Sequence, residues 1–391
     1  MSAPCPIPGA QSWSDPEGTG AIGVMIVGEA LGESEAEDHL PFRPYAPAGS
    51  VLERAIRRAG FSRGQFLLWN VCPVQPPKNW LEGAPWEGEA ITWGQELLVK
   101  MVEQYKPRCI LALGNIPLKA TTGLAGEQRS VSHIRGWHVP SLSMFMGVPI
   151  VASFHPSFLR RGAMGLFSVL VHDLKLAVAV ANSKVGQTVK FYSPVLSRDV
   201  EYTHHPVSYI DITNPVVPEE YTTQPSERDA WEFLREVEDD PSKLIAYDIE
   251  TPRSGSVTEN ESDELGDTDI LSIQFSRRPR SGIFLPWREP FIEVAKRVLA
   301  TPNPKAGANT WRFDNPVLRG HGCRLNGTNH DIRWAWGHLQ PDLRASLQFV
   351  ASFYCAGKGW APWKHVHSSH VGFYGIRDVD AVQEILCGDS D

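Results

Sequence analysis

The chain has 391 residues, of which 42% are hydrophobic and 21% are charged, and its formal net charge at pH 7 is −8. At roughly 150 residues per domain, this length predicts two or three domains. The negative charge argues against a protein that coats nucleic acid, but not against an enzyme whose carboxylates are neutralised by metal ions. No segment approaches the ~18 consecutive apolar residues of a membrane span, and the amino terminus lacks the pattern of a signal peptide. We therefore expect a cytoplasmic protein with no membrane partner.

Six cysteines are spread along the chain without forming a C-x-x-C pair: Cys5, Cys72, Cys109, Cys323, Cys355 and Cys387. This spacing is typical of reduced thiols in a cytosolic protein.

After a segment at residues 1–20 that we expect to be flexible, residues 21–182 alternate strand-like apolar runs with helical patterns. The expected strands are 22–30, 66–74, 109–114 and 148–156, and the expected helices are 49–60, 91–107 and 167–182. This alternation predicts an α/β domain in which helices cover both faces of a parallel sheet. Ligands bind such sheets beyond the carboxyl ends of the strands, where Glu29, Asn70 and His155 fall.

Residues 183–225 are rich in Pro, Ser and Thr without a helical period, which predicts an extended linker, with short strands as an open alternative. Residues 226–391 then form a further domain. It begins with a capped helix at 226–240 and continues with strands at 244–251, 269–276 and 281–287, a helix at 291–300 and a strand at 304–310.

Carboxylates recur at three places in this last domain. Asp248 and Glu250 occupy positions i and i+2 of an apolar strand, so both side chains lie on one face. Asp314 ends the sequence Asn-Thr-Trp-Arg-Phe-Asp where a helix begins, and Tyr374 and Asp378 are one helical turn apart. We expect the four carboxylates to converge on two divalent cations about 4 Å apart.

The ordered motifs D-x-E, N-x-x-x-F-D and Y-x-x-x-D resemble the DEDD-type 3′→5′ proofreading exonuclease domain of family A DNA polymerases, over roughly residues 240–386. The resemblance implies a ribonuclease H-like mixed-sheet fold and a site for two Mg²⁺ or Mn²⁺ ions. Mg²⁺ suits a site made only of oxygen ligands.

The resemblance also implies a role for each matched residue. Asp248, Glu250 and Asp378 would hold the metal that activates water, while Asp248 and Asp314 would reach the metal that stabilises the leaving 3′ oxygen. Tyr374 would orient the water, and Asn309 would position the terminal nucleotide.

Three further residues near these motifs have other interpretations. Asp331 matches a D-T step of the family but lacks the Thr, so we expect it to be structural. His365 and His367 leave open a two-histidine metal site, although an exposed loop is the favoured interpretation.

The amino-terminal domain carries its own ordered motifs: Gly28-Glu29-Ala30-Leu31-Gly32, Leu40-Pro41-Phe42, Asn70-Val71, Pro76-Pro77-Lys78-Asn79 and a stretch from His155 to Arg161. Each motif alone could be an ordinary turn or loop. Together, over about residues 22–180, they resemble the family 4 and 5 uracil-DNA glycosylases. That resemblance implies a three-layer fold around a parallel sheet.

The residue types suit the capture of a uracil that has left the base stack. Phe42 would stack on the base, the Asn70 amide would both donate to it and accept from it, and His155 would donate to O2. Glu29 would position water or stabilise the sugar.

Further positions match the family around this centre. Glu35 and Asn79 are among them. Phe158 and Leu159 would form a wedge that fills the vacated gap, with Arg160 and Arg161 on phosphates.

The chain also departs from the family. Leu31 replaces a Pro, and Trp80 stands where Arg is usual. Family 4 members hold an iron–sulfur cluster through four cysteines. One of those ligand positions is Val74 here, with Cys72 two residues away, so we predict no iron–sulfur cluster. Whether the domain excises uracil or only binds it stays open.

A uracil-glycosylase-like domain followed by an exonuclease domain resembles the front half of certain bacteriophage family A DNA polymerases, without the polymerase palm and fingers. We therefore expect a replication and repair protein, located in the cytoplasm of a bacterium or of a phage-infected host. Its partners would be DNA, with single-stranded 3′ ends and uracil, and a separate DNA polymerase subunit. The alternatives are a non-catalytic DNA-binding accessory module and the front fragment of such a polymerase.

Overall fold

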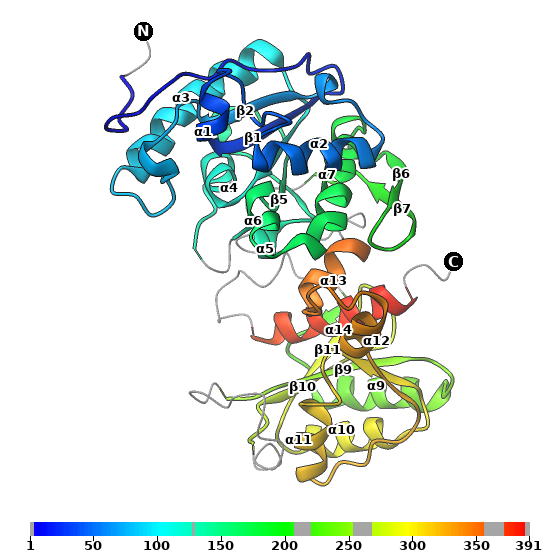
Figure 1. The fold of residues 1–391 in the computed structure, drawn as a ribbon. Coiled ribbons are helices and arrows are strands. Elements are labelled where there is room, and N and C mark those ends of the chain that lie inside the picture. The colour runs from blue at the N-terminus through cyan, green and yellow to red at the C-terminus, as the bar shows by residue number, and fades with distance from the viewer. Residues whose placement is uncertain (1–3, 127–129, 207–219, 253–267, 356–370, 388–391) are drawn as a thin grey trace. The chain divides into compact units, whose positions relative to one another are not determined.

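The computed structural model describes residues 4–126, 130–206, 220–252, 268–355 and 371–387. These residues divide into two compact units, which are described separately (Figure 1). The first unit contains the described residues up to 206, and the second contains those from 220 onward.

A five-stranded sheet in the order β2-β1-β3-β5-β4 forms the centre of the first unit. Its strands are β1 (Val24–Ala30), β2 (Leu67–Cys72), β3 (Cys109–Leu113), β4 (His138–Val139) and β5 (Ile150–Ser153). The four longer strands pair in parallel, and β4 pairs antiparallel with β5. They are almost wholly buried, as continuous apolar runs between two helical layers require. The predicted parallel sheet is confirmed, but β4 is too short to give a sequence signal.

Helices cover both faces of this sheet (Figure 1). They are α1 (Glu33–Ala36), α2 (Pro47–Ala59), α3 (Glu87–Tyr105), α4 (Asn115–Thr122), α5 (Val131–Ile134), α6 (Pro156–Arg160) and α7 (Phe167–Ala181). α3 and α4 contact each other and the sheet, while α2 contacts α6 and α7, of which α7 packs on β3 and β5. Met164–Ala181, which includes α7, is apolar and long enough to cross a membrane, but 67% of this segment is buried, as in a core helix.

Two segments outside the expected domain pack onto it. β6 (Thr188–Ser193) and β7 (Arg198–Thr203) form an antiparallel hairpin that contacts α7, inside the region expected to be an extended linker. Near the amino terminus, expected to be flexible, Gln11 and Glu17 form isolated bridges beside β2. Short irregular segments have no periodic pattern, so only their contacts in the folded chain reveal their place.

A six-stranded sheet in the order β13-β12-β9-β10-β11-β8 forms the second unit. Its strands are β8 (Tyr221–Thr222), β9 (Ile245–Glu250), β10 (Ser272–Ser276), β11 (Gly282–Pro286), β12 (Lys305–Gly307) and β13 (Asn329–Asp331). β9, β10 and β11 are antiparallel neighbours, whereas β12 runs parallel to β9 and β13 parallel to β12.

Helices pack on this sheet as well. They are α9 (Glu227–Asp239), α10 (Phe291–Ala300), α11 (Asp314–Gly320), α12 (Ile332–Leu339), α13 (Leu347–Tyr354) and α14 (Val371–Cys387). The main core joins α9 and α10 to the odd-numbered residues of β9, which are Ile245, Tyr247 and Ile249. α14 contacts β9, β10 and β11. The even-numbered side chains of β9 point away from the main core.

Candidate functional site

A cavity of about 740 Å³ opens in the first unit where its parallel strands end. Residues that follow β1, β3 and β5 line it, together with Phe42 and the stretch that ends at Glu82. This is the edge of a parallel sheet at which ligands bind. The cavity is therefore the principal candidate site of this unit.

Phe42, which lines the cavity, and Asn70 of β2 approach each other at Gly28. A Cβ atom added to Gly28 would lie 2.3 Å from the Phe42 ring and 2.3 Å from Asn70 Oδ1. Only glycine lets these two side chains approach each other. Asn70 is 2% exposed, and its Nδ2 has no hydrogen-bond partner among the described residues. A buried donor without a partner costs about 1–3 kcal/mol, which a bound ligand with an acceptor would offset.

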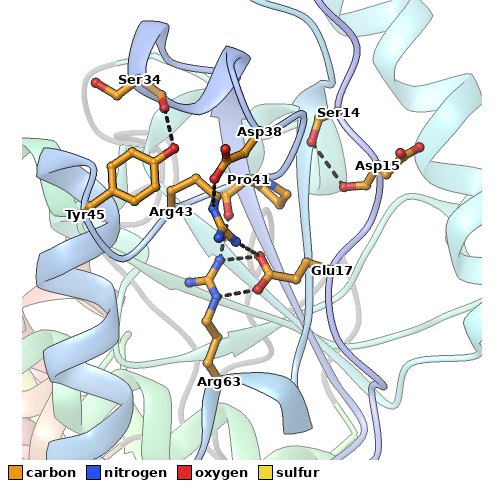
Figure 2. A network of polar contacts seen from close by, with 9 residues as sticks. All are labelled: Ser14, Asp15, Glu17, Ser34, Asp38, Pro41, Arg43, Tyr45 and Arg63. Atoms are coloured by element: carbon orange, nitrogen blue, oxygen red, sulfur yellow. Dashed lines mark hydrogen bonds and ion pairs between the residues drawn. The ribbon is translucent and has the colours of Figure 1, made fainter.

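Arginine side chains fix the loop that carries Phe42 (Figure 2). Arg63 binds both carboxylate oxygens of Glu17, at 2.9 and 2.6 Å, and donates to the Pro41 carbonyl at 2.6 Å. Arg43 reaches the same Glu17 carboxylate at 3.5 Å. Charge-assisted bidentate pairs are among the stronger polar contacts. They hold Phe42 at a φ of 51°, in the left-handed region.

Glu35 also binds the backbone of this loop. Its Oε2 accepts the Gly32 N–H at 2.9 Å, and its carboxylate also receives the backbone N–H of Phe42. The Tyr45 hydroxyl donates to the Ser34 carbonyl at 3.1 Å (Figure 2). Glu35 lines the cavity, as expected of a substrate-binding residue, and its hydrogen bonds also position Phe42.

His155 lines the cavity as the N-cap of α6. Its Nδ1 accepts the Ser157 N–H at 3.2 Å and lies 2.7 Å from the Ser157 hydroxyl. Burial, aided by the charge of Arg161, lowers the pKa of His155 to about 4, so the ring is neutral at pH 7. Because Nδ1 is the acceptor, the proton of the neutral ring lies on Nε2. His155 thus offers an N–H donor.

Glu29 ends the β1 motif inside the cavity. Burial and the charge of Glu82 raise the pKa of Glu29 to about 7, although a backbone N–H of Glu82 and the charge of Arg161 oppose the rise. Glu82 accepts from Asn115 Nδ2 at 3.1 Å. Sequence reasoning missed Glu82, because only the fold brings this carboxylate beside Glu29.

The predicted wedge is only half present. Phe158 is 37% exposed, stacks on Phe154 and lines the cavity. Leu159 is 0% exposed, so its assignment to the wedge is wrong in this conformation. In a one-turn helix, neighbouring positions point to different sides, and α6 turns Leu159 inward. Arg160 and Arg161 are exposed, and Arg161 lines the cavity.

The remaining family position and its neighbour lie on the rim. Asn79 lines the cavity and accepts from Gln75 Nε2 at 3.3 Å. Trp80, where the family has Arg, is 47% exposed and lines the cavity. Its Nε1 donates to the Glu82 carbonyl at 2.9 Å.

The cysteines near this site do not supply a cluster ligand set. Val74 is buried, and Cys72 is a buried thiol whose sulfur lies 3.6 Å from the Ala90 carbonyl oxygen. Burial and the nearby Cys5 raise the pKa of Cys72. Throughout the described ranges, no group of three or more His, Cys, Asp or Glu side chains is placed to hold a metal ion. These residues do not fit a four-thiolate cluster.

In the second unit, Asp248 and Glu250 share the face of β9 that points away from the main core, as predicted. Asp248 lies opposite Gln274 of β10. α14 packs here, because a Cβ atom on Gly375 would lie 2.4 Å from the Gln274 side chain. Asp378 is half-buried, three residues further along α14.

Three residues considered in the sequence analysis lie outside what the structure describes. α14 includes Tyr374, but its side chain lies outside the described part of the chain. His365 and His367 also lie outside the described residues.

Asp314 begins α11 and is 2% exposed. Its Oδ1 accepts the Ile249 N–H at 3.0 Å, which ties α11 to β9. Burial raises the pKa of Asp314 to about 7, and the charges of Asp331 and Glu250 add to the rise. Asp314 is therefore close to one carboxylate of β9. The described carboxylates nevertheless do not form a group of three suited to a metal ion.

Asp331 has the structural role expected of it. It is the N-cap of α12 and accepts the N–H groups of Arg333 at 2.9 Å and Trp334 at 3.3 Å. It also accepts the backbone N–H of Asn309 at 3.1 Å. The Asn309 side-chain oxygen, expected near a nucleotide, accepts from Arg333 at 2.9 Å.

Residues 16–175 match the family model described as the Uracil DNA glycosylase superfamily. The chain is 33% identical over 146 residues to the Type-4 uracil-DNA glycosylase of Pyrobaculum aerophilum, covering 37% of this chain and 71% of that protein. It is 30% identical over 155 residues to the Type-4 uracil-DNA glycosylase of Thermotoga maritima, covering 39% and 75%. With the Sulfurisphaera tokodaii Type-4 enzyme, identity is 33% over 178 residues, covering 45% and 78%.

The pKa of Glu29 predicts a pH-dependent stability. Its folded pKa of about 7 exceeds the ordinary value of 4.5, so the folded state binds more protons between these values. Stability contributed by this group is therefore lost as pH rises through that window. Relative to the parent protein, Glu29→Gln should become more resistant to urea on going from pH 5 to pH 8. The exposed Glu89→Gln is the matched control, and equal shifts in both variants would contradict the prediction.

Proposed function

Because this chain belongs to the uracil DNA glycosylase superfamily through its amino-terminal domain, we propose that this domain removes uracil from DNA. The observation that carries the proposal is the set of groups around Gly28. A buried amide donor without a partner, an aromatic ring and a neutral histidine donor occur at one sheet edge. Uracil presents a flat ring with carbonyl acceptors and an N–H donor, and these three groups complement it.

The chemistry then follows from the residues in place. Phe42 offers the extruded base a face for stacking, and Asn70 pairs with its edge. As the C1′–N1 bond breaks, its electron pair moves onto uracil, and His155 Nε2–H stabilises the charge that builds on O2. Glu29, in its ionised form, stabilises the positive sugar and directs water to C1′.

This activity is tested with a single-stranded oligonucleotide that contains one uracil, followed by alkali to break abasic sites. Loss of one preorganised donor lowers the rate of such reactions by about 100- to 1,000-fold. We expect His155→Ala and Asn70→Ala to cut strand breakage by this factor, and the exposed His330→Ala to leave it unchanged. Breakage that is equal in all four proteins would overturn the assignment of the site.

We also propose that this domain works without an iron–sulfur cluster. The residues that would have to bind the iron support this. Val74, which occupies one of the cysteine positions of family 4, has no sulfur, and the Cys72 thiol is buried in the sheet. Aromatic packing fastens the amino-terminal segment, since Trp13 meets Trp93 edge to face at 6.0 Å.

Protein purified without oxygen should be colourless, because four-cysteine clusters absorb visible light. Iron analysis of the same sample provides a second measurement. A brown protein with stoichiometric iron and sulfide would contradict the proposal.

For the second domain we propose 3′→5′ exonuclease activity with Mg²⁺. Three antiparallel strands followed by two parallel ones, with Asp248 and Glu250 on the α14 face of β9, support it together with the ordered motifs. Asp314, which lies close to Glu250, supports it too. The carboxylates as placed do not fit a metal ion, so we derive no metal-dependent step from them.

Purified protein with a 5′-labelled single strand tests this second activity. We expect shortening from the 3′ end with Mg²⁺ or Mn²⁺, abolished by EDTA and lowered about 100-fold or more in Asp248→Asn, since electrostatic terms dominate such sites. Asp239→Asn, an exposed carboxylate at the end of α9, is the control. No shortening in the parent, with strand binding retained, would favour the accessory-module alternative.

A further inference from the structure

Aromatic and basic side chains gather on the surface of the second unit around the start of α12. Trp311 and Trp334 are 47% and 39% exposed, and their ring centroids are 5.9 Å apart. The Arg312 guanidinium lies 5.6 Å from the centre of the Trp334 ring. A hollow of about 350 Å³ adjoins them, lined by Arg312, Arg333, Trp334, Gly337, His338 and Ala345.

We propose that this Trp–Arg surface, formed by Trp311, Arg312, Arg333, Trp334 and His338, binds a single-stranded nucleic acid. Unpaired bases would stack on the two indole faces, and phosphates would lie against the guanidinium groups. Sequence-independent single-strand binders combine these two features, because every base has a π-face and every nucleotide carries a negative charge. A base within a duplex has no free face to offer.

The charge of the surface selects this class of partner. The whole chain carries 45 acidic residues against 37 lysines and arginines. Among the described residues, the lining of the hollow nevertheless includes two arginines and a histidine, and no acidic residue. A polyanion complements this local excess of positive charge.

The contact between α12 and α13 is made by a third tryptophan and does not require the two exposed indoles. Trp336, two positions beyond Trp334 on the same helix, is 3% exposed and stacks on Phe353 at 5.7 Å. It provides the apolar contact between α12 and α13. Trp334 is instead exposed, as is Trp311. Exposed apolar side chains that are grouped together indicate a binding surface.

The buried carboxylate of Asp331 fixes the backbone of both tryptophans. Asp331 accepts the backbone N–H of Trp311 at 2.9 Å through Oδ2 and the backbone N–H of Trp334 at 3.3 Å through Oδ1. The backbone of each tryptophan is thereby fixed to the same side chain, which is 3% exposed. A surface held in place before binding loses less entropy when a ligand arrives.

This inference depends on neither proposed activity, because stacking requires neither a metal ion nor bond cleavage. The test therefore uses the whole chain in EDTA with uracil-free strands. A twelve-nucleotide oligothymidylate carrying 4-thiothymidine is photo-cross-linked, and the attached peptides are identified by mass spectrometry. We expect peptides that contain Trp311 or Trp334. Cross-links confined to the first domain would overturn the proposal.

Affinity is then measured by fluorescence anisotropy with the same strand. Removing stacking partners in Trp311→Ala/Trp334→Ala should weaken binding at least about five-fold. The double phenylalanine variant keeps flat rings and should stay close to the parent. Leu271→Ala, which removes an exposed apolar side chain on the same unit, is the control. Matching thermal denaturation curves establish that the variants fold.

The outcomes separate the possible ligands. Weaker binding of both oligothymidylate and oligoriboadenylate, an RNA strand that also contains no uracil, by the double alanine variant supports a surface for single strands in general. An effect on only one of them identifies the DNA or RNA preference. Equal affinity of parent and double alanine variant for both strands would overturn the proposal and leave the surface for a protein partner.

Discussion

The missing side chain of Gly28 is the constraint on which the first site depends. Any Cβ atom there would collide with both the Phe42 ring and the Asn70 oxygen. Their convergence, however, also needs the Phe42 loop to be held against the sheet. Arg63 does this by linking the Pro41 carbonyl to Glu17 (Figure 2). A strand end, a loop and a segment near the amino terminus therefore contribute to one small contact.

This dependence gives the amino-terminal segment more importance than its sequence indicates. Glu17 pairs by its backbone with Leu68 of β2 and by its carboxylate with Arg63 and Arg43. Further back, Ile7 is buried, and Trp13 packs on Trp93 of α3. Ordinary apolar packing and hydrogen bonds thus anchor a segment whose Glu17 carboxylate is connected to the site through Arg63.

Strand ends could be predicted from the sequence because they depend on local pattern. Apolar runs predicted β1, β2 and β5, and the edge of a parallel sheet indicated Glu29 and His155, which line one cavity. Asn70 lies within β2 and meets Phe42 at Gly28. The burial of Leu159 could not be predicted, because a one-turn helix gives too few positions to define a face.

Features that depend on distant contacts were also beyond the sequence. The His155 proton sits on Nε2 only because the N-cap geometry uses Nδ1 as an acceptor. Glu82 approaches Glu29 only after the segment between β2 and α3 folds back. The Asp331 carboxylate gathers backbone amides from two segments, whereas its sequence context indicated only a helix start.

Each unit keeps one carboxyl group whose pKa is raised to about 7. Glu29 is buried beside Glu82, and Asp314 is buried beside Glu250 and Asp331. Burial penalises the charged form of each group and neighbouring negative charge adds to the penalty, so each group binds its proton up to a higher pH than an exposed carboxyl group. Any positive charge that arrives would compete with that proton and lower the pKa.

In the reaction proposed for the first unit, the positive charge that develops on the sugar during glycosidic bond cleavage would have this effect and would stabilise ionised Glu29. In the second unit, the same imbalance lies beside the face of β9 that carries Asp248 and Glu250. Buried like charges destabilise a fold, and in the second unit Asp314 offsets part of this cost by accepting the Ile249 N–H, which ties α11 to β9.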